Sequence, residues 1–139
     1  MADGTFGGGR PGWLDRLGHV RNVVRQQMIV RQLDKHLPGA PARVLDVGAG
    51  QGTQSIRLAR AGHRVLAVEP DPEMRAVFQA TLSAERAEVQ DRVTLRDGSV
   101  LDLAAVTRGE VYDAVLLLGP KGATCATSTR SARRHALMT

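Results

Sequence analysis

Apolar residues recur every three or four positions over residues 13–37, which is the spacing of an amphipathic helix. Arginines and a lysine stand between them and predict a solvated face. Gly18 favours a break, which would give a short helix followed by a long one. The helical pattern ends at the Pro-Gly-Ala-Pro run of residues 38–41.

Beyond residue 41, short apolar runs alternate with helical patterns. Strands are predicted at 43–47, 64–69, 92–96 and 112–118, helices at 51–61 and 72–87, and a short helical or irregular turn near 101–106. Strands and helices that alternate at these lengths are typical of right-handed βαβ units. We therefore expect an α/β fold with a parallel sheet and helices on both of its faces.

Length and composition narrow the classes of protein that fit. A chain of 139 residues fits one small domain, and 42% hydrophobic content argues against wholesale disorder. With only 3% aromatic residues, modules that stack single-stranded bases on aromatic side chains are disfavoured. A single cysteine excludes an intramolecular disulfide framework and a cysteine-rich zinc site, and the scattered histidines give metal binding no support.

The net charge of +5 first suggests a nucleic-acid partner. However, residues 121–139 hold four basic residues and no acidic one, so residues 1–120 carry 15 basic and 14 acidic residues, a net of +1. The near-neutral body does not support nucleic-acid binding. We see no targeting segment or apolar run long enough to span a membrane, and we expect a cytoplasmic protein without a membrane contact.

The segment with the clearest chemistry is Val-Leu-Asp-Val-Gly-Ala-Gly-Gln-Gly, residues 44–52. A buried strand runs into three glycines at alternate positions and then opens a helix. Glycines there leave room for a ligand at the backbone, and the carboxyl end of a parallel strand is where nucleotide-like molecules bind. The third glycine, Gly52, comes one position earlier than the dinucleotide fingerprint requires, so a pyrophosphate-binding turn fits worse. Glu69, at the end of the second strand, suits ribose hydroxyls.

These features resemble class I S-adenosylmethionine-dependent methyltransferases over about residues 13–120. Their first motif, an acid between hydrophobic residues followed by G-x-G-x-G, is matched from Val44 to Gly52. An acid after the third strand (Asp97) and a Tyr-Asp-hydrophobic fourth strand follow in the family's order. The resemblance implies a Rossmann-like, doubly wound parallel sheet, partial in this chain, with strand order 3-2-1-4 and an N-terminal helix.

The resemblance also implies S-adenosylmethionine as the cofactor and a set of residues that bind it. In the family, the first acid steers the methionine end, the acid after strand two binds the ribose, and the acid after strand three reaches the adenine amino group. The expected cofactor-binding residues are Asp46, Gly48, Ala49, Gly50, Gly52, Glu69, Pro70, Asp97, Gly98, Ser99 and Gly119. Catalytic residues and the methyl acceptor are not specified by these motifs.

Each landmark also has a plain structural interpretation. Asp46 could be a polar residue satisfied at a strand end, while Glu69 and Asp97 could begin turns. We interpret Asp113 as structural and Cys125 as an incidental thiol. The four histidines are interpreted as surface residues: His19, His36, His63 and His135.

The chain departs from the family after its fourth strand. We divide it into a flexible, Gly-rich N-terminus (1–12), a partial cofactor-binding domain (13–120) and a basic tail outside the family fold (121–139), which we expect to be disordered. The tail is rich in Ala, Arg, Ser and Thr, as in a coding sequence translated out of frame. The hypothesis is that a longer methyltransferase is truncated here, which would leave the fourth strand exposed and favour self-association through it.

Four functions follow from these observations. The leading one is an S-adenosylmethionine-dependent methyltransferase, represented by its cofactor-binding half and inactive if truncation removes the substrate side. The alternative is a non-catalytic S-adenosylmethionine-binding fragment, or an inert remnant of a frameshifted gene. A nicotinamide-binding domain is disfavoured by the glycine spacing, and a nucleic-acid-binding protein is supported only by the charge of the tail.

Overall fold

A computed structural model describes residues 10–37, 39–119 and 122–127 of the 139-residue chain. The chain divides into two units, residues 1–35 and 36–139. The first contains helix α1 (Arg10–His36) almost entirely, and the second is an α/β unit. Helix α1 is continuous through Gly18, so the predicted break is wrong. One glycine costs only about 1 kcal/mol in a helix interior, and the residues around it are largely good helix formers.

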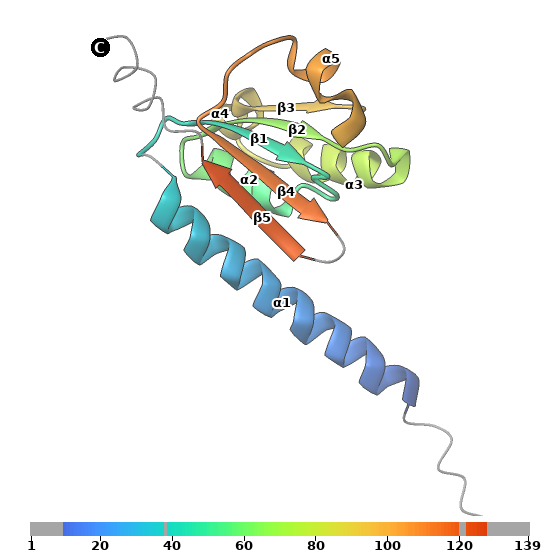
Figure 1. The fold of residues 1–139 in the computed structure, drawn as a ribbon. Coiled ribbons are helices and arrows are strands. Elements are labelled where there is room, and N and C mark those ends of the chain that lie inside the picture. The colour runs from blue at the N-terminus through green and yellow to red at the C-terminus, as the bar shows by residue number, and fades with distance from the viewer. Residues whose placement is uncertain (1–9, 38, 120–121, 128–139) are drawn as a thin grey trace, which may run out of the picture. The chain divides into compact units, whose positions relative to one another are not determined.

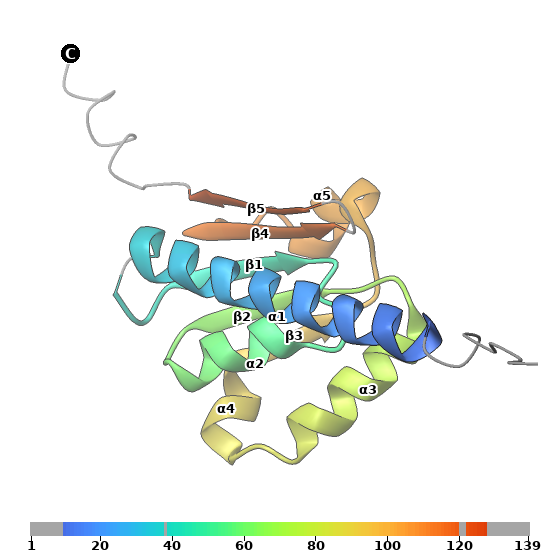
Figure 2. The same ribbon diagram turned by 90° about the horizontal axis from the view of Figure 1, so that it is seen from below.

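The second unit is built on a five-stranded sheet in the order β3-β2-β1-β4-β5 (Figures 1 and 2). The four predicted strands are present as β1 (Arg43–Val47), β2 (Arg64–Val68), β3 (Val93–Arg96) and β4 (Ala114–Gly119). They pair in parallel, with Val44 opposite Val65 in β2 and opposite Ala114 in β4. The Rossmann-like order 3-2-1-4 is therefore confirmed.

Strand β5 (Gly122–Thr127) was not predicted from the sequence. It runs antiparallel to β4, from Gly119 opposite Gly122 to Ala114 opposite Thr127. The expectation of an exposed β4 was therefore wrong, and so was that of disorder for 122–127. The free edge of β4 offers a row of unpaired backbone groups, and a short return segment satisfies them without any apolar pattern of its own. The rest of the predicted tail lies outside the described residues, and the argument for self-association through β4 loses its premise.

Helices cover the two faces of the sheet to different extents. One face packs against α2 (Thr53–Arg60), α3 (Pro72–Ser83) and α4 (Ala87–Arg92), around the fully buried ring of Phe78. The other face carries Leu45, Val47, Leu66 and Val68, and it meets residues of α5 (Leu103–Thr107), which follows the short 3₁₀ turn η1 (Val100–Asp102). In Figure 1, α5 lies on the opposite side of the sheet from α2 and α3.

The helix predicted at 72–87 ends earlier, at Ser83, and the short helix α4 that follows was not predicted. Asp71 caps α3 by accepting a hydrogen bond from the Glu73 N–H (2.9 Å), and Pro72 occupies the first turn. Near its end, the Ser83 hydroxyl donates to the Gln79 carbonyl (2.8 Å). The Gln90 side chain then donates to the carbonyl of Glu85 (2.7 Å), so a residue of α4 satisfies the turn between the helices.

One predicted surface histidine is buried. His63 is 8% exposed, and its Nδ1 accepts a hydrogen bond from the Ala42 N–H (3.1 Å). Burial lowers the pKa of His63, which favours the neutral form that this contact needs. His19 and His36 are exposed, as predicted. The fourth histidine, His135, lies outside the described residues.

Candidate cofactor site

The glycine turn after β1 is fastened to the end of β2. The backbone N–H groups of Gly48 and Ala49 both donate to the Val68 carbonyl, at 2.8 and 3.1 Å. The Gly52 N–H returns to the Ala49 carbonyl (3.0 Å), and the Gly52 carbonyl accepts the Ile56 N–H of α2 (2.9 Å). Backbone hydrogen bonds thus fix the turn to β2 at one side and to α2 at the other.

Glycine is present at two positions of the turn for different structural reasons. At Gly52, with φ of +86°, an added Cβ would lie 2.6 Å from the ring of Phe78, so only glycine allows α2 and α3 to pack here. At Gly50, with φ of +57°, an added Cβ would meet nothing within 4 Å. The backbone at Gly50 therefore faces open space, which leaves room for a ligand to approach it.

Glu69 joins the glycine turn to the segment that follows β2. Its Oε2 accepts the Gly50 N–H (2.8 Å) and its Oε1 accepts the Asp71 N–H (3.2 Å). The residue is 8% exposed. Because a carboxylate oxygen accepts more than one hydrogen bond, both oxygens retain acceptor capacity for a ligand's hydroxyl groups.

Asp46 is fully buried beneath this turn. The Ser55 hydroxyl donates to its Oδ2 (2.6 Å), whereas its Oδ1 has no hydrogen-bond partner among the described residues. Burial raises the pKa of Asp46 to about 6, with the Ser55 hydrogen bond opposing the shift and the charge of Glu69 adding to it. An orphaned carboxylate oxygen is costly to bury, and a cationic or N–H donor group would compensate it.

Arg75 connects the segments that follow β2 and β3. Its Nη1 is within hydrogen-bond distance of the carbonyls of Glu69 and Pro70 (both 2.8 Å) and of Asp97 Oδ1 (3.0 Å). Asp97 is exposed, so its second oxygen is open to a ligand. The sequence did not single out Arg75, which looks like an ordinary solvated residue of α3. It did not single out Ser55 either, which looks like an ordinary polar residue of α2.

The remaining predicted residues flank this group. An added Cβ at Gly98 would lie 2.7 Å from Val106, so this glycine allows α5 to pack. The Ser99 hydroxyl accepts the Leu101 N–H (3.2 Å) and caps η1. Gly119 ends β4, the neighbour of β1, at the same edge of the sheet. The structure thus gathers the predicted residues at the carboxyl ends of the four parallel strands, which is where open α/β sheets bind ligands.

Other expected features can be read from the described residues. Asp113 has the structural role predicted for it, since its Oδ2 accepts the Arg43 N–H (2.8 Å). Within residues 10–37, 39–119 and 122–127, His, Cys, Asp and Glu nowhere form a group of three suited to a metal ion. No described helix is long and apolar enough to cross a membrane.

Comparison with known proteins gives consistent matches. A family model described as "Methyltransferase domain" matches residues 44–134 and so includes β5. A ubiquinone biosynthesis O-methyltransferase of Xanthomonas oryzae is 42% identical over 97 residues, which are 70% of this chain and 37% of that protein. An uncharacterized methyltransferase of Mycobacterium bovis is 43% identical over 70 residues, which are 49% of this chain and 29% of that protein.

Solved structures support the same fold. The C-terminal domain of precorrin-6Y C5,15-methyltransferase from Rhodobacter capsulatus matches with a TM-score of 0.54 at 21% identity, covering 76% of this chain and 52% of that one. The chain spans about a third of the length of the curated relatives described above.

Proposed function

The chain belongs to the class I S-adenosylmethionine-dependent methyltransferases, and on this premise we propose that it binds S-adenosylmethionine at the carboxyl edge of its parallel sheet and takes part in methyl transfer. The observation that carries the proposal is the contact between Glu69 and Gly50. It places a carboxylate with spare acceptor capacity beside an open stretch of glycine backbone.

The residues present fit the parts of this cofactor. Asp46 Oδ1, the buried oxygen without a partner, suits the ammonium group at the methionine end. Glu69 suits the ribose hydroxyls, and the free oxygen of Asp97 suits the adenine amino group. The other proposed cofactor-binding residues lie in the turn after β1, in the segments after β2 and β3, and at the end of β4: Gly48, Ala49, Gly50, Gly52, Pro70, Gly98, Ser99 and Gly119.

Bound S-adenosylmethionine supplies a methyl group already activated by its positively charged sulfur. The contribution of this chain is to hold the cofactor in one orientation, so that the acceptor meets the methyl group in line. The described acids and backbone amides perform that binding.

The experiment is a calorimetric titration of the full chain with S-adenosylmethionine and, separately, with NADH. We expect saturable binding of the first and none of the second, because the early third glycine fits a dinucleotide poorly. Binding of NADH alone would contradict the proposal.

Binding without transfer is the second candidate function. It is favoured because every site residue identified above is assigned to holding the cofactor, and none is assigned to a methyl acceptor. Incubation with methyl-labelled S-adenosylmethionine and a panel of phenols and catechols separates the two. Labelled methyl product supports transfer, while saturable binding with no product from any acceptor supports the binding function.

A further inference from the structure

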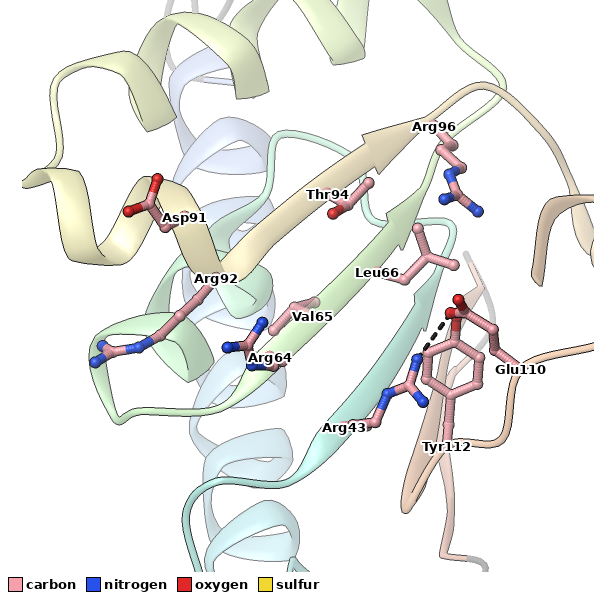
Figure 3. Close-up of a pocket in the computed structure, with 10 residues that line it drawn as sticks. All are labelled: Arg43, Arg64, Val65, Leu66, Asp91, Arg92, Thr94, Arg96, Glu110 and Tyr112. Carbon is pink, nitrogen blue, oxygen red and sulfur yellow. Dashed lines mark hydrogen bonds and ion pairs between the residues drawn. The ribbon is translucent and has the colours of Figure 1, made fainter. Parts of the chain in front are cut away.

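A small pocket lies on the sheet face opposite α2 and α3, and the last two residues of α4 contribute to its lining (Figure 3). Its volume is about 140 Å³, and its charged lining consists of four arginines and two acids: Arg43, Arg64, Arg92, Arg96, Asp91 and Glu110. The cofactor function proposed above uses none of these residues. All of them belong to the unit that begins at His36.

Three of the arginines form a row at one end of the sheet. Strand register places Arg43 of β1 directly opposite Arg64 of β2. On the other side of Arg64, Arg92 is the last residue of α4 and immediately precedes Val93, which stands opposite Val65. Like charges on adjacent strands repel one another, so this row is unfavourable unless negative charge compensates it.

The acids of the pocket compensate only part of this charge. Glu110 pairs with Arg43 (2.8 Å), and the Arg43 guanidinium also lies 5.3 Å from the centre of the Tyr112 ring. Figure 3 shows this pair on one side of Leu66, with Arg64 and Arg92 on the other. Two positive charges of the lining therefore remain in excess.

Two other arginines of the lining are held by contacts that leave some of their N–H groups available. Arg92 Nη1 donates to the Ala59 carbonyl (2.9 Å), and Arg96 Nη1 donates to the Val106 carbonyl. A guanidinium has five N–H donors, so each still has several to offer. The Arg64 backbone N–H donates to the Ala42 carbonyl (2.9 Å), but its guanidinium has no hydrogen bond or ion pair with the part of the chain that the structure describes.

The size and chemistry of the pocket point to one class of ligand. Pockets for drug-sized molecules measure about 300–1,000 Å³, so a volume of about 140 Å³ suits a single small group. Arginine forks match the paired oxygens of phosphate, whose charge offsets the excess of two. We propose that this pocket binds a phosphate group, with Arg64 as its central ligand and Arg43, Arg92 and Arg96 around it.

The site is separate from the proposed cofactor site. Arg43, Arg64 and Arg92 stand at the amino ends of β1, β2 and β3, whereas Glu69 and Gly50 lie beyond the carboxyl ends. Arg96 ends β3, so it lines the pocket with its side chain while its backbone carbonyl accepts the Glu69 N–H (3.1 Å). The inference therefore does not depend on the proposed methyltransferase function. Phosphate could arrive free or as a monoester, and both present the same oxygens to the arginines.

The test is a calorimetric titration of the full chain with inorganic phosphate at constant ionic strength, with ribose 5-phosphate and acetate as parallel ligands. We expect saturable binding of inorganic phosphate. Equal affinity for ribose 5-phosphate identifies a monoester as an acceptable source, and its failure to bind restricts the site to free phosphate. Acetate binding as tightly as phosphate, or no saturable phosphate binding, would overturn the proposal.

Variants locate the site. Arg64→Gln should weaken phosphate binding about tenfold or more, because a charge-assisted contact contributes about 1.5–3 kcal/mol. Arg57→Gln is the matched control, since Arg57 is an exposed arginine of α2 outside the pocket, and it should change the affinity less than twofold. Glu110→Gln should tighten binding, because it releases Arg43. Equal losses in the Arg64 and Arg57 variants would show general charge attraction and contradict the site.

Two controls keep the result interpretable. Arg64→Lys retains the charge, and a partial return of affinity is expected if Arg64 is a ligand. Arg64→Gln should bind S-adenosylmethionine with the same affinity as the unsubstituted chain. A failure of cofactor binding and a failure of phosphate binding are therefore observed independently.

Discussion

The Glu69 carboxylate accepts a hydrogen bond from the Gly50 backbone N–H across 2.8 Å, which links the turn after β1 to the end of β2. Nineteen residues separate the two in the chain. The second oxygen of Glu69 is held by the Asp71 N–H, so the carboxylate is fixed in one orientation. The acceptor proposed for the ribose is thus positioned by backbone amides in the protein itself.

Replacing Asp46 with asparagine should stabilise the fold above pH 6. The pKa of Asp46 is raised to about 6 by burial, so the folded state holds a proton that the unfolded state releases above about pH 4. Stability contributed by this group is therefore present at low pH and declines as the pH rises from about 4 to 6. A shift of about two pKa units corresponds to roughly 3 kcal/mol.

Urea unfolding of Asp46→Asn and the unsubstituted chain at pH 4 and pH 7 measures this effect. The variant should be more stable at pH 7, and the difference should shrink at pH 4. A variant that is less stable at both pH values would show that the ionised carboxylate has an unrecognised partner. We also expect Asp46→Asn to bind S-adenosylmethionine more weakly, because the orphaned acceptor loses its charge.

Replacing Gly52 with alanine should destabilise the chain through a steric clash. The new methyl group would stand 2.6 Å from the ring of Phe78, which is fully buried and cannot move aside. We expect a loss of about 1–3 kcal/mol from overpacking, in addition to about 1–2 kcal/mol for the left-handed backbone.

Gly109→Ala is the matched control, because Gly109 also has a positive φ of +72° but nothing within 4 Å of an added Cβ. Its loss of stability should be only the cost of placing alanine in a left-handed backbone conformation. Denaturation midpoints of the two variants, measured side by side, separate the steric and backbone costs. Equal losses would contradict the close packing of α2 against α3.

Replacing Arg75 with alanine should loosen the segments after β2 and β3 together. The guanidinium lies within hydrogen-bond distance of the carbonyls of Glu69 and Pro70 and of the Asp97 carboxylate. We expect faster amide hydrogen exchange at Glu69, at Asp71 and at residues 97–99, and S-adenosylmethionine affinity lower by about tenfold.

Arg75→Lys should restore part of that affinity, and Arg57→Ala, on the exposed surface of α2, should leave it unchanged. The global free energy of unfolding of Arg75→Ala is also measured, so that a loss of affinity is distinguished from a general loss of stability. Weaker binding with unchanged exchange in both segments would argue against a role in positioning them.

The sequence predicted those parts of the fold that depend on local pattern. The four parallel strands were found because each is a short apolar run followed by a turn, and their order came from the family resemblance. The end of α3 at Ser83 and the helix α4 were missed because the turn between them depends on where Gln90 donates its side-chain hydrogen bonds. Strand β5 was missed because it is stabilised by the open edge of β4 rather than by its own residues.

The candidate site shows the same division between local and tertiary information. Asp46 and Glu69 were predicted because each occupies a fixed position relative to a strand end. Ser55 and Arg75 could not be predicted, since one reaches back to β1 from α2 and the other spans two loops from α3. Burial of His63 depends on its contact with Ala42, 21 residues away, which no local pattern reveals.

The most direct test of the central claim compares S-adenosylmethionine affinity in the unsubstituted chain, Glu69→Ala and Glu73→Ala by calorimetric titration. Glu73 is the control, because it is an exposed acid of α3 whose described contact uses only its backbone N–H. We predict saturable binding that Glu69→Ala abolishes or weakens at least tenfold and that Glu73→Ala leaves unchanged. Saturable binding of equal affinity in all three would contradict the proposed site at the Glu69–Gly50 contact.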